Sequence, residues 1–254
     1  MKTLRLSFLL LASSIGLQAQ NQSQVNFKDQ DSLSTITLEE VKLTGIKAKD
    51  NTPVTFTNVS KKDITSRNLG QDIPILLNYL PAVVTTSDAG AGIGYTGIRV
   101  RGSDATRVNV TLNGIPYNDA ESQGTFWVNL PDFASSVEQI QLQRGVGTST
   151  NGSAAFGASL NVETSGIQQN AFSSLSSSLG SFNTFKNTFQ FSTGMLNDHF
   201  SFSGRLSKIN SDGYIDRAAS NLDAYFFQAA FQDENTLIKA LIFGGHEITY
   251  QSWY

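Results

Sequence analysis

Cysteine and histidine, the side chains that most often form nucleophile–base pairs and transition-metal sites, are scarce in this chain. The 254 residues include no cysteine and only two histidines, His199 and His246. Without cysteine, neither a disulfide nor a thiolate metal site can form, and two imidazoles are too few for a multi-histidine centre. Nothing in the sequence resembles a catalytic triad or a paired acid and base. We therefore expect no enzyme activity, no bound metal and no cofactor.

A glycine-rich segment at residues 87–97 is the one stretch that suggests phosphate binding. It holds Gly90, Gly92, Gly94 and Gly97. A phosphate-cradling loop needs a helix directly after its glycines and a Lys-Ser or Lys-Thr pair, whereas a strand is expected here and the pair is missing. We predict a mobile surface loop instead. The formal net charge of −3 also argues against nucleic acid as the main partner.

Two short strands and two turns follow this loop. Ile98 and Val100 alternate with arginines, and Gly102 then breaks the first strand. The second strand has apolar residues on one face, at Val108, Val110 and Leu112. Asn113-Gly114 then supplies the residue pair that best tolerates positive φ in a tight hairpin. The pattern predicts a small, half-buried antiparallel unit.

Two helices are expected before this unit. Ser60 is typical of an N-cap, with Asp63 at the third helical position. A second helix is predicted to begin at Asp72 and to stop at Pro81, with leucines at positions 76, 77 and 80.

Beyond residue 165 the sequence alternates with period two. Phenylalanines at 185, 189 and 191 share one face, opposite lysine, threonine, glutamine and serine. Similar runs follow at residues 200–207, 225–231 and 236–243, separated by short turns and by one longer polar loop at residues 210–221. Aromatic faces opposite polar ones favour lipid outside and water inside, as in a transmembrane β-barrel. A soluble β-sandwich shows similar alternation and would bury Phe189 and Phe200 in its core.

The N-terminus is typical of a secretory signal peptide. Lys2 and Arg5 form the positive region, residues 6–11 the apolar core, and small residues lead to cleavage after Ala19 or Gln20. The alternative, a retained membrane anchor, needs about 20 apolar residues, and the polar residues that follow interrupt the run too soon. We expect an exported protein.

Four sequence blocks together resemble the plug domain of TonB-dependent outer-membrane receptors. They are Ile-Arg-Val-Arg-Gly at 98–102, Val-Thr-Leu-Asn-Gly-Ile-Pro at 110–116, Val-Glu-Gln-Ile-Gln-Leu-Gln-Arg-Gly at 137–145, and Ala-Ala-Phe-Gly-Ala-Ser-Leu-Asn-Val at 154–162. The resemblance spans roughly residues 38–164. It implies an α+β plug domain followed by antiparallel transmembrane β-barrel strands. The expected boundaries are a signal peptide at 1–20, a leader at 21–50, the plug at 51–165 and the first barrel strands at 166–254.

In this family, an extended segment near the mature N-terminus, the TonB box, binds the periplasmic domain of TonB. The segment that is similar to it consists of Leu38, Glu39, Glu40, Val41, Lys42, Leu43 and Thr44. An extended segment on a flexible tether can add itself as a strand to a partner's sheet. The alternative is that these residues form the first strand of the globular domain.

The resemblance also implies a locking role for Arg101 and Arg144. In related receptors, arginines at these two Arg-Gly positions pair with carboxylates of the barrel wall. A guanidinium suits a buried bidentate pairing better than an ammonium does. The alternative is a surface arginine at each position. Many relatives have proline two residues after the second arginine, whereas this chain has Val146.

Plug loops of this family meet the substrate below an extracellular vestibule. The residues of the two loops that could stack on a ligand or hydrogen-bond to it are Tyr95, Tyr117, Glu121, Phe126 and Trp127. The alternative for Phe126 and Trp127 is packing against the barrel wall.

The number of strands that residues 170–254 can form is too small for a closed barrel around a plug. A barrel that encloses a plug has about 22 strands, whereas residues 170–254 offer roughly five strands of about 10 residues. We expect the N-terminal part of a larger receptor in the outer-membrane lipid, for uptake of a ferric siderophore, haem or another large extracellular nutrient. The alternative function is an exported, soluble β-rich binding or adhesion protein.

Overall fold

The computed structural model describes residues 47–147 and 155–250, which all belong to one compact unit, Leu38–Tyr254. The predicted signal peptide and the predicted TonB-binding residues 38–44 lie outside the described residues. Among the described residues, no helix combines the length and the apolar character that crossing a membrane requires.

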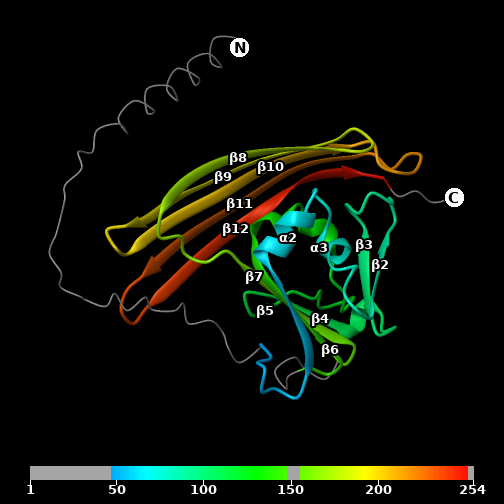
Figure 1. The fold of residues 1–254 in the computed structure, drawn as a ribbon, viewed down its shortest axis with the longest axis horizontal. Helices are drawn as coiled ribbons and strands as arrows, with labels where there is room; N and C mark the ends of the chain where they lie inside the picture. The colour runs from blue at the N-terminus through cyan, green and yellow to red at the C-terminus, as the bar shows by residue number, and fades with distance from the viewer. Residues whose placement is uncertain (1–46, 148–154, 251–254) are drawn as a thin grey trace, which may run out of the picture. The chain divides into compact units, whose positions relative to one another are not determined.

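The N-terminal region, residues 47–165, is built on a mixed five-stranded sheet of order β1-β6-β7-β4-β5 (Figure 1). Its strands are β1 (Thr55–Ser60), β4 (Val108–Leu112), β5 (Ile115–Pro116), β6 (Val137–Arg144) and β7 (Ala158–Thr164). The β4–β7 pair is parallel and the other pairs are antiparallel. A separate antiparallel pair joins β2 (Val83–Ser87) to β3 (Thr96–Val100).

Local sequence signals place the turns and helix starts of this region. The predicted hairpin is confirmed: Asn113 and Gly114 have φ of 50° and 82°, and Leu112 pairs with Ile115. Ser60 caps α2 (Lys61–Arg67) in a capping box with Asp63, as predicted. The second helix, α3 (Ile73–Leu76), ends earlier than predicted. The described part of the region also contains the 3₁₀ turns η1 (Ala105–Arg107), η2 (Trp127–Asn129) and η3 (Phe133–Ser136).

The predicted loop at residues 87–97 is present as the connection between β2 and β3, but it does not lie wholly at the surface. Ala89 and Ile93 are buried, and Ile93 packs in a small apolar cluster with Ile209 and Leu222. The backbone is also held, because Asp72 N–H donates to the carbonyl of residue 92 at 2.9 Å. The glycines therefore allow the loop to pack closely; a Cβ at Gly92, for example, would lie 3.3 Å from the side chain of Ile75.

The C-terminal region is an antiparallel sheet in which neighbours in sequence are neighbours in space. Its order is β12-β11-β10-β9-β8, and it is open among the described residues (Figure 1). The strands are β8 (Ala171–Gly180), β9 (Thr184–Leu196), β10 (Phe200–Ser211), β11 (Ser220–Gln232) and β12 (Leu237–Thr249). The predicted fold class, an α+β region followed by antiparallel barrel-type strands, is confirmed.

The two faces of this sheet differ in polarity. The face turned to the N-terminal region carries buried polar side chains such as Lys186, Thr188 and Arg205. The other face leaves large apolar side chains exposed; Phe189 is 41% and Phe200 is 44% exposed. A soluble sandwich would bury these rings. The sandwich alternative is therefore not supported by the described residues.

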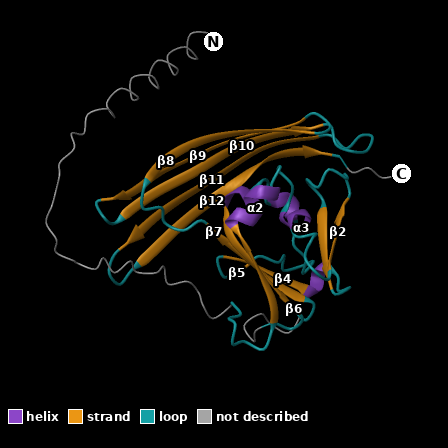
Figure 2. Cartoon of the chain, in the orientation of Figure 1, coloured by secondary structure: helices purple, strands orange, loops and turns teal. Residues whose placement is uncertain are grey.

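The main hydrophobic core lies between the helices and the mixed sheet and reaches the antiparallel sheet. It includes Ile64 of α2, Leu160 of β7, and Phe226 of β11. Phe133 contacts Phe226 and Phe243 edge to face, with ring centroids 6.1 and 5.0 Å apart. Helices α2 and α3 lie on the side of the mixed sheet that faces β8–β12 (Figure 2).

Candidate functional site

A buried carboxylate, Asp132, joins the N-terminal region to the antiparallel sheet. Its oxygens lie 2.8 Å from Nζ of Lys186 and 2.7 Å from Nη1 of Arg205. Lys186 belongs to β9 and Arg205 to β10, and all three side chains are buried. We call this three-residue cluster the ionic lock.

Hydrogen bonds hold each member of the ionic lock in place. Asp132 has a left-handed backbone, φ 46°, just before η3. This turn presents Ser135 and Ser136 to the cations: Lys186 Nζ donates to Ser135 Oγ at 2.9 Å, and Arg205 Nε donates to Ser136 Oγ at 2.7 Å. Buried charges are tolerated when they are both paired and hydrogen-bonded, and the lock meets both conditions.

The charges of the lock keep Asp132 ionised. Burial alone would raise the pKa of this carboxyl, but the positive charges of Arg205 and Lys186 outweigh burial and lower the pKa below its ordinary value. One buried carboxylate thus faces two buried cations. Removal of the carboxylate would leave two buried positive charges without a counter-charge.

The two arginines predicted to lock the plug have different surroundings: Arg101 is exposed, as in the surface alternative, and Arg144 is not. Arg144 is buried and donates from Nε to the carbonyl of Pro81 and from Nη2 to Oγ1 of Thr57, each at 3.0 Å. Both partners lie in the N-terminal region. Burial, with the nearby charge of Arg101, lowers the pKa of Arg144. Within residues 47–147 and 155–250 neither arginine forms an ion pair, so their locking role stays a prediction.

The lock that the structure does contain has the opposite polarity. The N-terminal region supplies the carboxylate, Asp132, and the sheet supplies the cations, Lys186 and Arg205. Sequence reasoning missed these residues. The available signal was the presence of a lysine and an arginine on strand faces that otherwise carry serine, threonine and glutamine.

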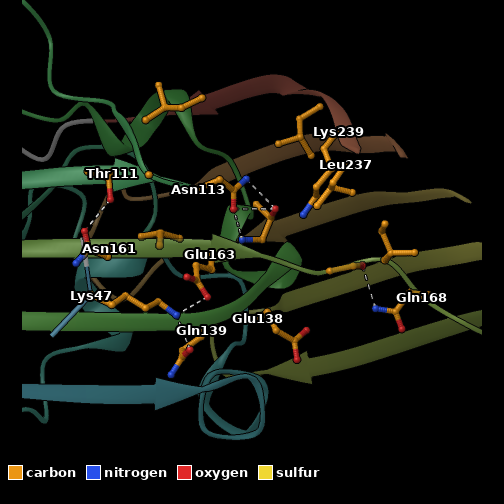
Figure 3. A pocket seen from close by; sticks show the side chains of 17 residues that line it. Lys47, Thr111, Asn113, Glu138, Gln139, Asn161, Glu163, Gln168, Leu237 and Lys239 are labelled. Carbon is orange, nitrogen blue, oxygen red and sulfur yellow. Dashed lines mark hydrogen bonds and ion pairs between the residues drawn. The ribbon is translucent and has the colours of Figure 1, made fainter. Parts of the chain in front are cut away.

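A second polar site lies where the leader joins the N-terminal region. Lys47 Nζ lies 2.5 Å from Glu163 Oε2 and donates to Gln139 Oε1 at 2.9 Å (Figure 3). These residues line a pocket of about 540 Å³ together with residues of β4 and the start of β12. The predicted TonB-binding segment ends three residues before Lys47. We call this place the leader exit.

The five predicted ligand residues do not share one environment. Tyr95, Glu121 and Phe126 are exposed, and Tyr117 is half-buried beside the main core. Trp127 is 3% exposed and belongs to the core itself. Burial agrees with the packing alternative for Trp127. A ligand-binding role for the other four residues stays a prediction.

Asp72 is a buried carboxyl that forms no ion pair within the described residues, and it makes the stability of the protein depend on pH. Its Oδ2 accepts from Thr96 Oγ1 at 2.8 Å, while Oδ1 has no partner among the described residues, and Glu247 and Asp132 add further negative charge nearby. Burial raises the pKa of Asp72 well above its ordinary value. The folded state therefore holds the proton at pH values where the unfolded state has lost it, and stability falls as pH rises through the raised pKa.

We expect Asp72→Asn to stabilise the protein at pH 7.5 by about 1–3 kcal/mol, because it removes an incompletely paired buried carboxyl. The gain should shrink as pH falls toward about 3.9, the pKa of an unfolded aspartate. Thermal unfolding at several pH values measures both. Asp119→Asn is the control of opposite sign, because hydrogen bonds from Ser122 lower the pKa of Asp119. A pH-independent effect at Asp72 would contradict the prediction.

Comparisons with known proteins agree with this architecture. Residues 48–159 match the family described as TonB-dependent Receptor Plug Domain. The chain is 30% identical over 173 residues to the vitamin B12 transporter BtuB of Vibrio vulnificus, a match that covers 67% of this chain but only 27% of that protein.

Solved structures show the same fold. The siderophore receptor PirA of Acinetobacter baumannii matches 77% of this chain and 32% of its own, with a TM-score of 0.59 and 18% identity. The copper transporter OprC matches 76% of this chain and 31% of its own, with a TM-score of 0.62 and 16% identity. The chain thus spans about a quarter to a third of the length of these proteins.

Proposed function

Because this chain belongs to the TonB-dependent receptor family, we propose that it forms the plug and part of the barrel wall of a receptor that takes up a large nutrient across the outer membrane. The observation that carries the proposal is the two-faced sheet. Its apolar face suits lipid, and its polar face holds a folded domain through the ionic lock.

The transported ligand is proposed only as a class. The similar proteins are named for vitamin B12, a siderophore and copper. Porins handle small solutes, so a ferric siderophore, haem or another large nutrient fits an energised receptor. Exposed Tyr95, Glu121 and Phe126, with half-buried Tyr117, are our candidates for ligand contact.

Uptake is proposed to proceed without bond chemistry. Ligand binding outside alters the periplasmic disposition of residues 38–44, which TonB then binds by strand addition. A pull driven by the inner-membrane proton gradient displaces part of the plug. Export through a signal peptide, cleaved after Ala19 or Gln20, would bring the chain to this membrane.

Binding of the TonB periplasmic domain tests this function. Val41→Pro removes a backbone N–H and fixes φ, so strand addition should fail. We expect Val41→Pro to weaken binding at least about tenfold, since several backbone hydrogen bonds are lost together, as measured by calorimetry on the full chain in detergent micelles.

Val41→Ala is the matched control, because it keeps the N–H and should bind nearly as well as the wild type. Equal binding by the proline variant would exclude residues 38–44 as the TonB contact. Absence of binding by the wild-type chain would remove the proposed function.

A further inference from the structure

The side chain of Gln141, on β6, uses its whole hydrogen-bonding capacity. Its Oε1 accepts from Ala48 N–H and from Gln143 Nε2, each at 2.8 Å. Its Nε2 donates to the Ala48 carbonyl at 3.0 Å and to Asn58 Oδ1 at 2.8 Å. A side-chain amide offers two donors and two common acceptor positions, and all four are occupied. At 2% exposure, Gln141 makes these bonds away from water.

The hydrogen bonds from Gln141 to Ala48 resemble those between neighbouring strands. It binds both the N–H and the carbonyl of one backbone residue, as a strand does in an antiparallel hydrogen-bonded pair. Ala48 is buried as a result. We call this pair of bonds the amide clamp.

The amide clamp lies at the first point where a pull on the leader would meet the plug. Lys47 and Ala48 come directly after residues 38–46 and before β1. Among the described residues, β1 pairs only with β6, at the edge of the mixed sheet, and Asn58 of β1 lies opposite Gln141 in register. The side chain of Gln141 therefore connects its own strand, β6, to the edge strand β1 and to Ala48 at the leader exit.

The ionic contact beside the clamp is better placed to exchange with water. The side chains of Lys47 and Glu163 are 16% and 23% exposed, and part-exposed ion pairs contribute little because water competes for both charges. The sheltered bonds of Gln141 should therefore limit opening.

We propose that Gln141 is a positioning residue that anchors Ala48 to β6, so that a pull on the chain before Lys47 reaches β1 only when the amide clamp breaks. The inference rests on the proposed function for its purpose, although the clamp can be tested without TonB. Opening would free Ala48 and, by releasing Asn58, would loosen β1 from its partner strand. The leader and the first strand of the plug would thus be released in a fixed order.

Hydrogen exchange on the full chain in detergent micelles tests the proposal. Gln141→Met keeps the size of the side chain and removes its polar atoms. We expect amide exchange in residues 47–54 to speed up by about tenfold, since both sheltered hydrogen bonds to Ala48 are lost, with unchanged exchange in β4 and β7. Gln139→Met is the matched control on the same strand, because it removes one bond to Lys47 and leaves both the Glu163 pair and the clamp; it should change exchange less than about twofold.

Two results would overturn the proposal: unchanged exchange at residues 47–54 in Gln141→Met, or an equal rise in β4 and β7, which would mean general loosening. If that variant does not fold, Asn58→Ala removes one partner of Gln141 and leaves its bonds to Ala48 and Gln143. It should raise exchange at residues 47–54 about two- to threefold, and no rise would count against the clamp. Failure of TonB binding in a chain with a normal clamp would instead be a failure of the proposed function.

Discussion

Replacement of Asp132 with alanine is expected to lower the free energy of unfolding by about 3–5 kcal/mol, because it leaves the two buried cations of the ionic lock without a counter-charge. Lys186 and Arg205 would keep their serine partners but lose the only carboxylate that they contact in the described part of the chain. Denaturant unfolding of the full chain in micelles measures the loss. Limited proteolysis should then cut the N-terminal region first.

An exposed ion pair of the same sheet provides the control. Lys208 and Asp223 lie 2.8 Å apart, and their side chains are 50% and 57% exposed. Asp223→Ala should cost at most about 1 kcal/mol, because water solvates the remaining lysine. Equal losses for the two alanine variants would show that Asp132 is not a buried lock.

The sign of the pH dependence follows from the lowered pKa of Asp132. A carboxylate whose folded pKa is depressed contributes stability above its unfolded pKa, about 3.9. That contribution is lost as pH falls through the folded pKa. The lock should therefore persist at neutral pH and weaken only in strong acid, in contrast to Asp72, whose burial acts in the opposite direction.

Two adjacent aromatic residues are expected to differ sharply when truncated. Trp127→Ala should cost about 3–5 kcal/mol of unfolding free energy, because it leaves a large cavity in the core. Phe126→Ala should cost less than about 1 kcal/mol, because its ring is 46% exposed while that of Trp127 is 3% exposed. Denaturant unfolding of both variants measures the difference.

The same pair separates packing from ligand contact. If Phe126 stacks on the nutrient, Phe126→Ala should weaken ligand binding while stability stays near that of the wild type. A Trp127→Ala variant of unchanged stability would show that the indole is not a core residue and would restore it as a candidate for ligand contact.

Features encoded by neighbouring residues could be predicted from the sequence. The capping box of Ser60 and Asp63 and the Asn113-Gly114 hairpin depend on residues one to three positions apart. The period-two strands beyond residue 165 also follow directly from alternation, because successive side chains of a strand point to opposite faces. The fold class was therefore available from local patterns and the family resemblance.

The ionic lock and the amide clamp could not be predicted in this way. Asp132 meets cations 54 and 73 positions away, and Gln141 meets a backbone 93 positions away. Nothing in a single sequence pairs such residues. The burial of part of the loop at residues 87–97 was missed for a related reason: its glycines suggested an exposed loop, whereas its Ile93 packs with the distant residues Ile209 and Leu222.

The strand order also sets an order of assembly. Within residues 155–250, strands β8 to β12 pair only with their sequence neighbours, so each hairpin closes a short loop and can form early. In contrast, β1 must find β6 across about 80 residues of intervening chain, which carries a larger loop-closure cost. The ionic lock needs β9 and β10 side by side before Asp132 can meet both cations. We therefore expect the hairpins of β8–β12 to form first and the N-terminal region to complete its contacts with them last.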